Sequence, residues 1–236
     1  MSLDLPSGLV VRGFTPPLRL ADFRLAAFDM DSTLINIECI DEIAAAVGLK
    51  AEVAAITEAT MRGEIADFKE SLRRRVALLK GVPEQALQDI WDHTLQLNPG
   101  VESFLAALRD AGLKTLLVSG GFTFFSDRVA QRLKIDFARA NVLEFGSDGT
   151  LTGGLVMQSW GDICDGLEKQ RMLLQTCQAL GIAPSQAIAV GDGSNDLPMM
   201  GVAGLSIAYH AKPAVREKAM LAIDEGGMDR ALAVLR

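Results

Sequence analysis

Short apolar runs and amphipathic helical patterns alternate along most of this chain. An apolar run that ends abruptly in polar residues is typical of a buried strand, whereas a repeat near 3.6 residues is typical of a helix packed on one side. Strands are predicted at 24–28, 113–118, 137–145, 151–158, 187–190 and 204–209, with a short apolar segment near 221–224. Helices are predicted at 101–111, 123–133 and about 166–180, and at the end of the chain. This alternation indicates an α/β fold with a doubly wound parallel sheet, in which 137–145 and 151–158 form a hairpin.

One long stretch departs from the alternation, because residues 37–96 contain helical patterns and no strand pattern. The first of these patterns ends at Gly48, a typical stop signal. The four predicted helices are 39–48, 51–63, 66–81 and 83–95. We therefore expect a helical cap domain at 37–96, inserted into a catalytic core domain formed by 21–36 and 97–236. Residues 1–20 hold three prolines and are interpreted as a lead-in segment.

Polar clusters stand where predicted strands end, which is where ligands bind in open parallel sheets. The clusters are "DMDST" (29–33), "SGG" (119–121) and "GDGSND" (191–196), and Lys169 opens the helix that precedes the last of them. Four clusters that converge on one edge of a sheet are harder to explain by chance than any one of them alone.

The pair of carboxylates at the end of the first strand allows three interpretations. One is a helix N-cap, in which Asp31 or Ser32 caps the helix and Asp29 is structural. A calcium loop is weaker, because it would need Gly at Leu34 and Glu at Ile40. The third is a nucleophilic carboxylate with an acid/base partner, whose negative charges a divalent cation would offset.

The other clusters also have plainer alternatives. "GDGSND" is compatible with an ordinary turn, but Asp192 would complete an all-oxygen metal site and Asp196 would orient its ligands, which favours Mg²⁺. The Ser119 hydroxyl and the Gly120 amide can bind an oxyanion, although a strand-to-helix turn explains them too. Most lysines are solvated, yet Lys169 is placed to neutralise phosphoryl charge.

The composition of the chain limits the binding partners and the cellular compartment that we expect for it. The chain has 236 residues, 49% of them hydrophobic, and a formal net charge of −7. An acidic protein is a poor partner for nucleic acid or anionic membranes, so an anionic substrate must meet local cations or a metal. Cys39, Cys164 and Cys177 form no CxxC pattern, which favours reduced thiols in a cytoplasmic protein. We find no signal peptide and no run long enough to span a bilayer.

The four clusters together resemble the four motifs of the haloacid dehalogenase superfamily of phosphohydrolases. "NIECIDEIA", "ATMRGEIADFKESLRRRVALLKG", "SGGFTFF" and "AYHAKP" resemble the phosphoserine phosphatase family within it. The similarity covers about residues 24 to 225 and is weakest at 159–168, "SWGDICDGLE". The first motif alone indicates only the superfamily, whereas the cap segments indicate phosphoserine.

The resemblance implies a role for each matching residue of the core. Asp29 matches the nucleophile that becomes an aspartyl-phosphate, and Asp31 matches the general acid that later acts as general base. Mg²⁺ would be held by Asp29, Asp192 and the backbone carbonyl of Asp31, with Asp196 behind them. The remaining catalytic and phosphoryl-binding groups are Ser119, Gly120 and Lys169, and Asn195 matches a residue that contacts the substrate.

The resemblance also assigns the substrate-reading side chains of the cap. Glu38 matches the acid that meets the substrate ammonium, and Arg75 matches the arginine that meets its carboxylate. Met61 and Phe68 would line the apolar side. From the residues alone, Arg75 in "RRR" is more typical of a solvated basic face, and Glu38 suits a helix N-terminus.

The implied activity is Mg²⁺-dependent hydrolysis of O-phospho-L-serine to L-serine and phosphate, the last step of serine biosynthesis. One alternative is a related phosphomonoesterase or phosphotransferase that acts on phosphohomoserine, phosphothreonine or phosphoethanolamine. Another is a non-catalytic phosphometabolite-binding protein. We expect a small-molecule phosphomonoester as partner, no nucleic acid or membrane, and a cytoplasmic monomer or homodimer.

Overall fold

A computed structural model describes residues 5–61, 64–65 and 67–236. An eight-stranded sheet forms the centre of this described part, in the order β1-β8-β7-β6-β2-β3-β4-β5. The strands are β1 (Leu9–Val11), β2 (Leu25–Phe28), β3 (Lys114–Phe122), β4 (Phe137–Phe145), β5 (Leu151–Val156), β6 (Ala187–Gly191), β7 (Leu205–Tyr209) and β8 (Leu221–Ile223). All neighbours are parallel except the outer pairs β1–β8 and β4–β5. The predicted α/β class and the predicted hairpin are therefore confirmed.

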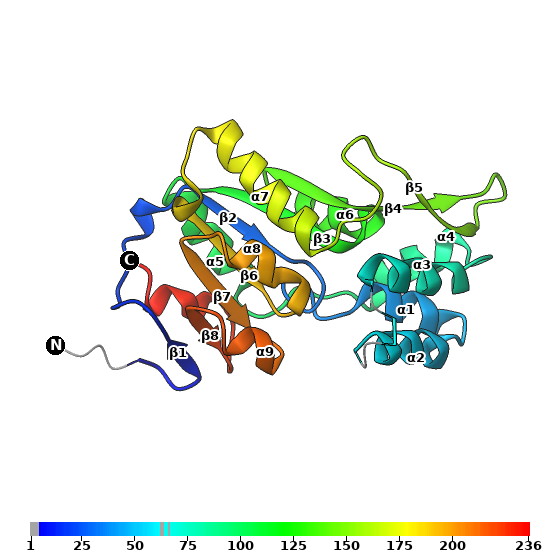
Figure 1. The fold of residues 1–236 in the computed structure, drawn as a ribbon, viewed down its shortest axis with the longest axis horizontal. Coiled ribbons are helices and arrows are strands. Elements are labelled where there is room, and N and C mark those ends of the chain that lie inside the picture. The colour runs from blue at the N-terminus through cyan, green and yellow to red at the C-terminus, as the bar shows by residue number, and fades with distance from the viewer. Residues whose placement is uncertain (1–4, 62–63, 66) are drawn as a thin grey trace.

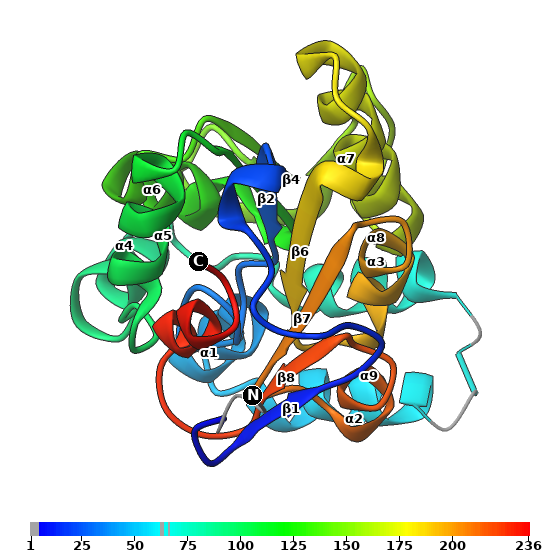
Figure 2. The same cartoon turned by 90° about the vertical axis from the view of Figure 1, so that its left-hand side faces the viewer.

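Helices cover both faces of the sheet (Figures 1 and 2). Those of the sheet region are α5 (Val101–Asp110), α6 (Thr123–Leu133), α7 (Gly166–Leu180), α8 (Leu197–Met200) and α9 (Pro213–Arg216). Alternate residues of a strand face opposite sides of a sheet. On β2, Phe28 accordingly packs edge-on against Phe104 of α5 on one side, with ring centroids 6.2 Å apart. On the other side, Leu25 shares a core cluster with Leu173 of α7.

Four helices form a separate group at one end of the sheet (Figure 1). They are α1 (Cys39–Ala46), α2 (Lys50–Met61), α3 (Phe68–Leu78) and α4 (Glu84–His93). The chain enters and leaves this group side by side, because Ile35 forms an antiparallel bridge with Leu97. Its far end is tied to the β4–β5 hairpin, since the Gly81 amide donates to the Leu151 carbonyl at 2.7 Å. No described helix is long and apolar enough to cross a membrane.

Three local features differ from the sequence prediction. The lead-in segment contains β1, which pairs with the exposed edge of β8, a contact that three residues cannot reveal by their own pattern. The "SGG" stretch belongs to β3, whose pairing with β4 shifts in register between Val118 and Phe122, so the expected loop is an irregular strand. The predicted last helix is a 3-10 helix, Met228–Ala233.

Candidate active site

The first site carboxylate directly follows the central strand β2. The Asp29 amide continues the ladder by donating to the Val190 carbonyl at 3.0 Å, and the side chain is almost fully buried. Its Oδ1 accepts a hydrogen bond from the Met30 amide at 2.7 Å. The chain then turns sharply at Ser32, whose φ of 54° lies in the left-handed region. This turn carries the chain toward α1 and leaves Asp29 facing the carboxyl edge of the sheet.

A buried lysine stands between two of the carboxylates. The Lys169 ammonium lies 2.8 Å from Asp29 Oδ1 and 2.7 Å from Asp196 Oδ1, and its side chain has no exposed surface. Burial alone would lower the pKa of Lys169, but the charges of Asp196 and Asp29 outweigh that effect and raise it. The lysine is held by the first turn of α7, whose N-cap Asp165 accepts from the Glu168 amide. Lys169 is therefore a fixed positive charge at the site.

Asp29, Asp192 and Asp196 bring carboxylate oxygens within 4.8 Å of one another. Burial, with the charges of Asp29 and Asp196, raises the pKa of Asp192 to about 7. Both oxygens of Asp196 already have protein partners, which makes Asp196 a poor direct ligand for a metal. Its Oδ2 accepts from the amides of Asp192 and Gly193, and its Oδ1 binds Lys169. Carboxylate oxygens without imidazole or thiolate fit a hard divalent cation. The site thus suits such a cation, with Asp29 and Asp192 as its candidate ligands.

Asp31, the second carboxylate of the "DMDST" motif, has different surroundings from Asp29. Asp31 Oδ2 accepts a 3.4 Å contact from the Cys39 amide, whereas Oδ1 is buried and has no hydrogen-bond partner among the described residues. Burial raises the pKa of the Asp31 carboxyl well above its ordinary value, and the charges of Glu38 and Asp29 add to this. These surroundings favour the protonated form of Asp31, which is the form that a general acid requires.

The "SGG" residues of β3 line the same cavity as Asp29 and Asp31. Ser119 is buried, and its Oγ accepts from the Gly121 amide at 2.9 Å. Asn141 of β4 fixes the neighbouring turn, since its Nδ2 donates to the Gly120 carbonyl at 2.7 Å. A side chain at Gly120 would lie 3.3 Å from the Phe68 ring, so glycine permits the close approach of α3.

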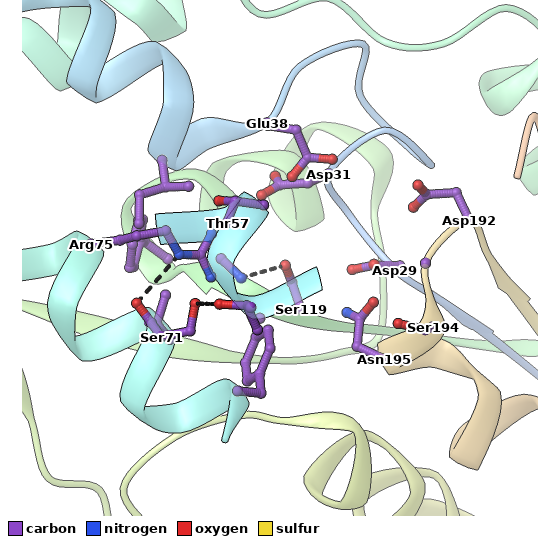
Figure 3. Close-up of a pocket in the computed structure, with 18 of the residues that line it drawn as sticks. Asp29, Asp31, Glu38, Thr57, Ser71, Arg75, Ser119, Asp192, Ser194 and Asn195 are labelled. Atoms are coloured by element: carbon purple, nitrogen blue, oxygen red, sulfur yellow. Dashed lines mark hydrogen bonds between the residues drawn. The ribbon is translucent and has the colours of Figure 1, made fainter. Parts of the chain in front are cut away.

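Figure 3 shows Arg75, Thr57 and Ser71 across the cavity from Asp29 and Asp192, whereas Glu38 lies beside Asp31. Glu38 accepts a 2.7 Å hydrogen bond from the Ser32 hydroxyl, and burial raises the pKa of its carboxyl. Arg75 projects from α3, and its Nε donates a long 3.4 Å hydrogen bond to the Ser71 carbonyl. The side chain of Met61 lies outside the described residues.

These groups enclose one cavity of about 500 Å³. Of the predicted residues, its walls include Asp29, Asp31, Glu38, Phe68, Arg75, Ser119, Gly120, Asp192 and Asn195. Lys169 and Asp196 lie behind this wall and reach the site through Asp29 and the loop amides. The structure therefore brings the core and cap candidates to a common space.

Sequence reasoning missed several polar side chains of the cavity, among them Thr57, Thr60, Ser71 and Lys212. Thr60 donates to the buried Ser71 hydroxyl at 2.7 Å. Ser71 stands three residues after Phe68 and four before Arg75, so helical spacing alone would have placed it on their face. Lys212 gives no such signal, because it belongs to a loop after β7.

Comparison with known proteins identifies the family of this chain. Residues 23–204 match the haloacid dehalogenase-like hydrolase family. The chain is 65% identical over 233 residues to a phosphoserine phosphatase of Polaromonas sp., covering 99% of this chain and 98% of that one. It is 66% identical over 229 residues to a phosphoserine phosphatase of Albidiferax ferrireducens, covering 97% and 96%.

A solved phosphoserine phosphatase, determined as a phospho-aspartyl intermediate analogue, is 36% identical. It superposes with a TM-score of 0.82 over 91% of this chain and 99% of the other. A match of this extent shows common descent of the whole fold and not of a single motif. The chain therefore belongs to the phosphoserine phosphatase family of the haloacid dehalogenase-like hydrolases.

Proposed function

We propose that this protein hydrolyses O-phospho-L-serine to L-serine and phosphate through an aspartyl-phosphate on Asp29. The observation that carries the proposal is a single cavity with two chemically different ends. One end holds the Asp29–Asp31 pair beside Lys169, which suits phosphoryl transfer. The cap adds one carboxylate, Glu38, beside Asp31, and one guanidinium, Arg75, on the opposite side of the cavity, and this pair of charges suits an amino acid.

The two motif carboxylates would work in opposite protonation states. Asp29 attacks phosphorus, the bond from phosphorus to the seryl oxygen breaks, and the proton of Asp31 passes to that oxygen. Asp31 then takes a proton from water, the water oxygen attacks phosphorus, and the bond to Asp29 breaks. The raised pKa of Asp31 supports this order of events.

We further propose that the site takes Mg²⁺, with Asp29, Asp192 and the backbone carbonyl of Asp31 as ligands. When bound, the ion would offset the negative charge of the phosphoryl group and of the carboxylates. Ser119 and the Gly120 amide would bind phosphoryl oxygens, and Lys169 would hold Asp29 and balance its charge. Asn195 lines the same end of the cavity.

Substrate recognition falls to the cap in this proposal. Glu38 would accept hydrogen bonds from the ammonium, and the planar fork of Arg75 would bind the carboxylate. Phe68 would cover the apolar part of the substrate, and we expect Met61 to do the same. Residues 37–96 would form the cap domain over a core of 21–36 and 97–236, and its closure would exclude water. The three free, buried cysteines support a cytoplasmic location, and we expect a monomer or homodimer.

A substrate panel with Mg²⁺ tests the proposal. Phosphoserine should have the highest kcat/KM, and phosphoethanolamine, which lacks the carboxylate, should fall by about 100-fold, as expected for a lost charge-assisted hydrogen bond. 3-Phosphoglycerate, with a hydroxyl in place of the amine, should fall by a similar factor. Equal turnover across the panel would contradict the roles of Glu38 and Arg75, and absence of hydrolysis would contradict the reaction itself.

A further inference from the structure

The connection between β5 and α7 makes a charged contact with the helices of the cap. Asp162, in the connection between β5 and α7, pairs with two side chains of cap helix α3. Its Oδ1 lies 2.9 Å from Lys69 Nζ, and its Oδ2 lies 2.5 Å from Arg73 Nη2. Lys69 also lies 3.8 Å from Asp165 Oδ2. Each oxygen of one carboxylate therefore binds a different cation of the same helix.

The same segment is bonded on its other side to the catalytic core. The Asp165 side chain accepts from the Glu168 amide at 2.8 Å, and its carbonyl accepts from the Lys169 amide at 2.9 Å, which begins α7. Between the two aspartates, the Cys164 amide donates to Asn141 Oδ1 at 2.8 Å. Asn141 in turn holds the Gly120 carbonyl. Four consecutive residues, 162–165, thus contact the cap, the start of α7 and the "SGG" strand.

Two faces of helix α3 make different contacts. Phe68, Ser71 and Arg75, at i, i+3 and i+7, line the substrate cavity. Lys69 and Arg73, at i and i+4, point to the 162–165 segment instead. Because a helix is rigid over three turns, anchoring one face fixes the position of the other.

We propose that Asp162 is a positioning residue that holds α3 in its substrate-binding position over the site. By pairing with Lys69 and Arg73 it fixes Phe68 and Arg75 relative to the turn that carries Lys169. The inference rests on the proposed function and adds to it a core residue outside the cavity. The hydrogen bond from Lys69 lowers the pKa of Asp162, so its charge persists over the neutral range.

We expect loss of the Asp162 ion pairs to affect substrate binding more than the rate of the chemical steps. Loss of the pairs leaves the backbone bonds between Gly81 and the β4–β5 hairpin intact, so the cap stays folded. It releases α3 from the 162–165 segment, so a smaller fraction of molecules has Phe68 and Arg75 in place, which weakens apparent affinity in proportion. Asp29, Asp31 and Lys169 keep their contacts, so the rate at saturation changes little.

Steady-state kinetics of Asp162→Asn tests the proposal, with Glu70→Gln as the matched control. Glu70 pairs with Arg74 at 2.8 Å on the same helix, but both residues belong to the cap. Partly exposed pairs are individually weak. We expect Asp162→Asn to raise KM for phosphoserine by about three- to tenfold, with kcat within about twofold of wild type. Glu70→Gln should leave both constants unchanged.

A double-mutant cycle separates positioning from general destabilisation. The cycle treats Lys69 and Arg73 as one unit. Adding Asp162→Asn to a Lys69→Gln/Arg73→Gln background should raise KM by much less than it does in the wild-type background, because both ion pairs of Asp162 are already broken. An unchanged KM in Asp162→Asn, additive effects in the cycle, or a fall in kcat matched by a lower thermal midpoint would overturn the proposal. Wild-type protein that hydrolyses no phosphomonoester would overturn the proposed function instead.

Discussion

The two ends of the cavity hold their charges in different ways. At the core end, Lys169, Asp29 and Asp196 form a buried set with side-chain exposures of 0%, 7% and 0%. Among the cap residues, Glu38 faces the cavity and accepts from the Ser32 hydroxyl, and Arg75 donates a long 3.4 Å hydrogen bond to the Ser71 carbonyl. The core end is arranged before substrate arrives, as electrostatic catalysis requires. The cap end keeps charges available that the substrate can satisfy.

This contrast separates the residues proposed for phosphoryl transfer from those proposed for substrate recognition. The former lie at strand ends and on the first turn of a long helix, where backbone hydrogen bonds fix them. The latter lie on or next to helices α1 and α3, and α3 contacts the β5–α7 connection through the Asp162 pairs. Variants at the core end should therefore stop the reaction, and variants at the cap end should change what reacts.

The largest effect is expected at Asp29. Asp29→Asn removes the attacking carboxylate while keeping its size, so phosphate release from phosphoserine should fall by about 10⁴-fold or more. Initial-rate assays of phosphate release measure the loss. Asp110→Asn, an exposed position at the end of α5, is the control and should retain full activity. Activity of Asp29→Asn within tenfold of wild type would exclude Asp29 as nucleophile.

A smaller and selective effect is expected at Arg75. Arg75→Met should lower kcat/KM for phosphoserine by about 100-fold, since a charge-assisted hydrogen bond to the substrate carboxylate is lost. The already low value for phosphoethanolamine should hardly change, because that compound has no carboxylate. Arg74→Met, next along the same helix and exposed, serves as the control. Equal losses on both substrates would show that Arg75 does not read the carboxylate.

The last effect concerns stability, not activity, and tests the core end without substrate. The pKa of Asp192 is about 7 in the folded protein and near 3.8 when unfolded, so the folded state binds the proton more tightly. The free energy of unfolding of metal-free protein should therefore fall as pH rises from about 4 to about 7, by up to about 4 kcal/mol from this group. Urea unfolding with a chelator measures this fall.

Two comparisons make the stability test specific. Excess Mg²⁺ should restore stability at neutral pH, because the bound ion offsets the charge of Asp192. Asp192→Asn should remove the Mg²⁺ effect and the Asp192 share of the pH dependence, whereas the share that comes from the raised pKa values of Asp31 and Glu38 should remain. A metal-free protein whose stability is flat across this range, or whose Asp192→Asn variant still responds to Mg²⁺, would contradict the assignment of Asp192 as a free ligand.

The core end of the site was largely predictable from sequence. Asp29, Ser119 and Asp192 each follow or end an apolar run, and parallel strands bring their carboxyl ends to one edge of the sheet. Asn141 was not predictable as a contact of Gly120, because a polar residue inside a strand carries no sign of its partner. Arg75 was ambiguous, since a basic run on a helix is usually solvated; its face of α3 became clear only from the packing.

By itself, the sequence determined the α/β class, the inserted helices and the polar clusters at strand ends, because these depend on local periodicity and on one rule of sheet geometry. Tertiary structure alone decided which distant residues meet. Asp162 and Lys69 are 93 positions apart, and β1 joins the sheet only because β8 offers an unpaired edge. Such contacts depend on how separately formed elements pack, and no periodicity within either element records its partner.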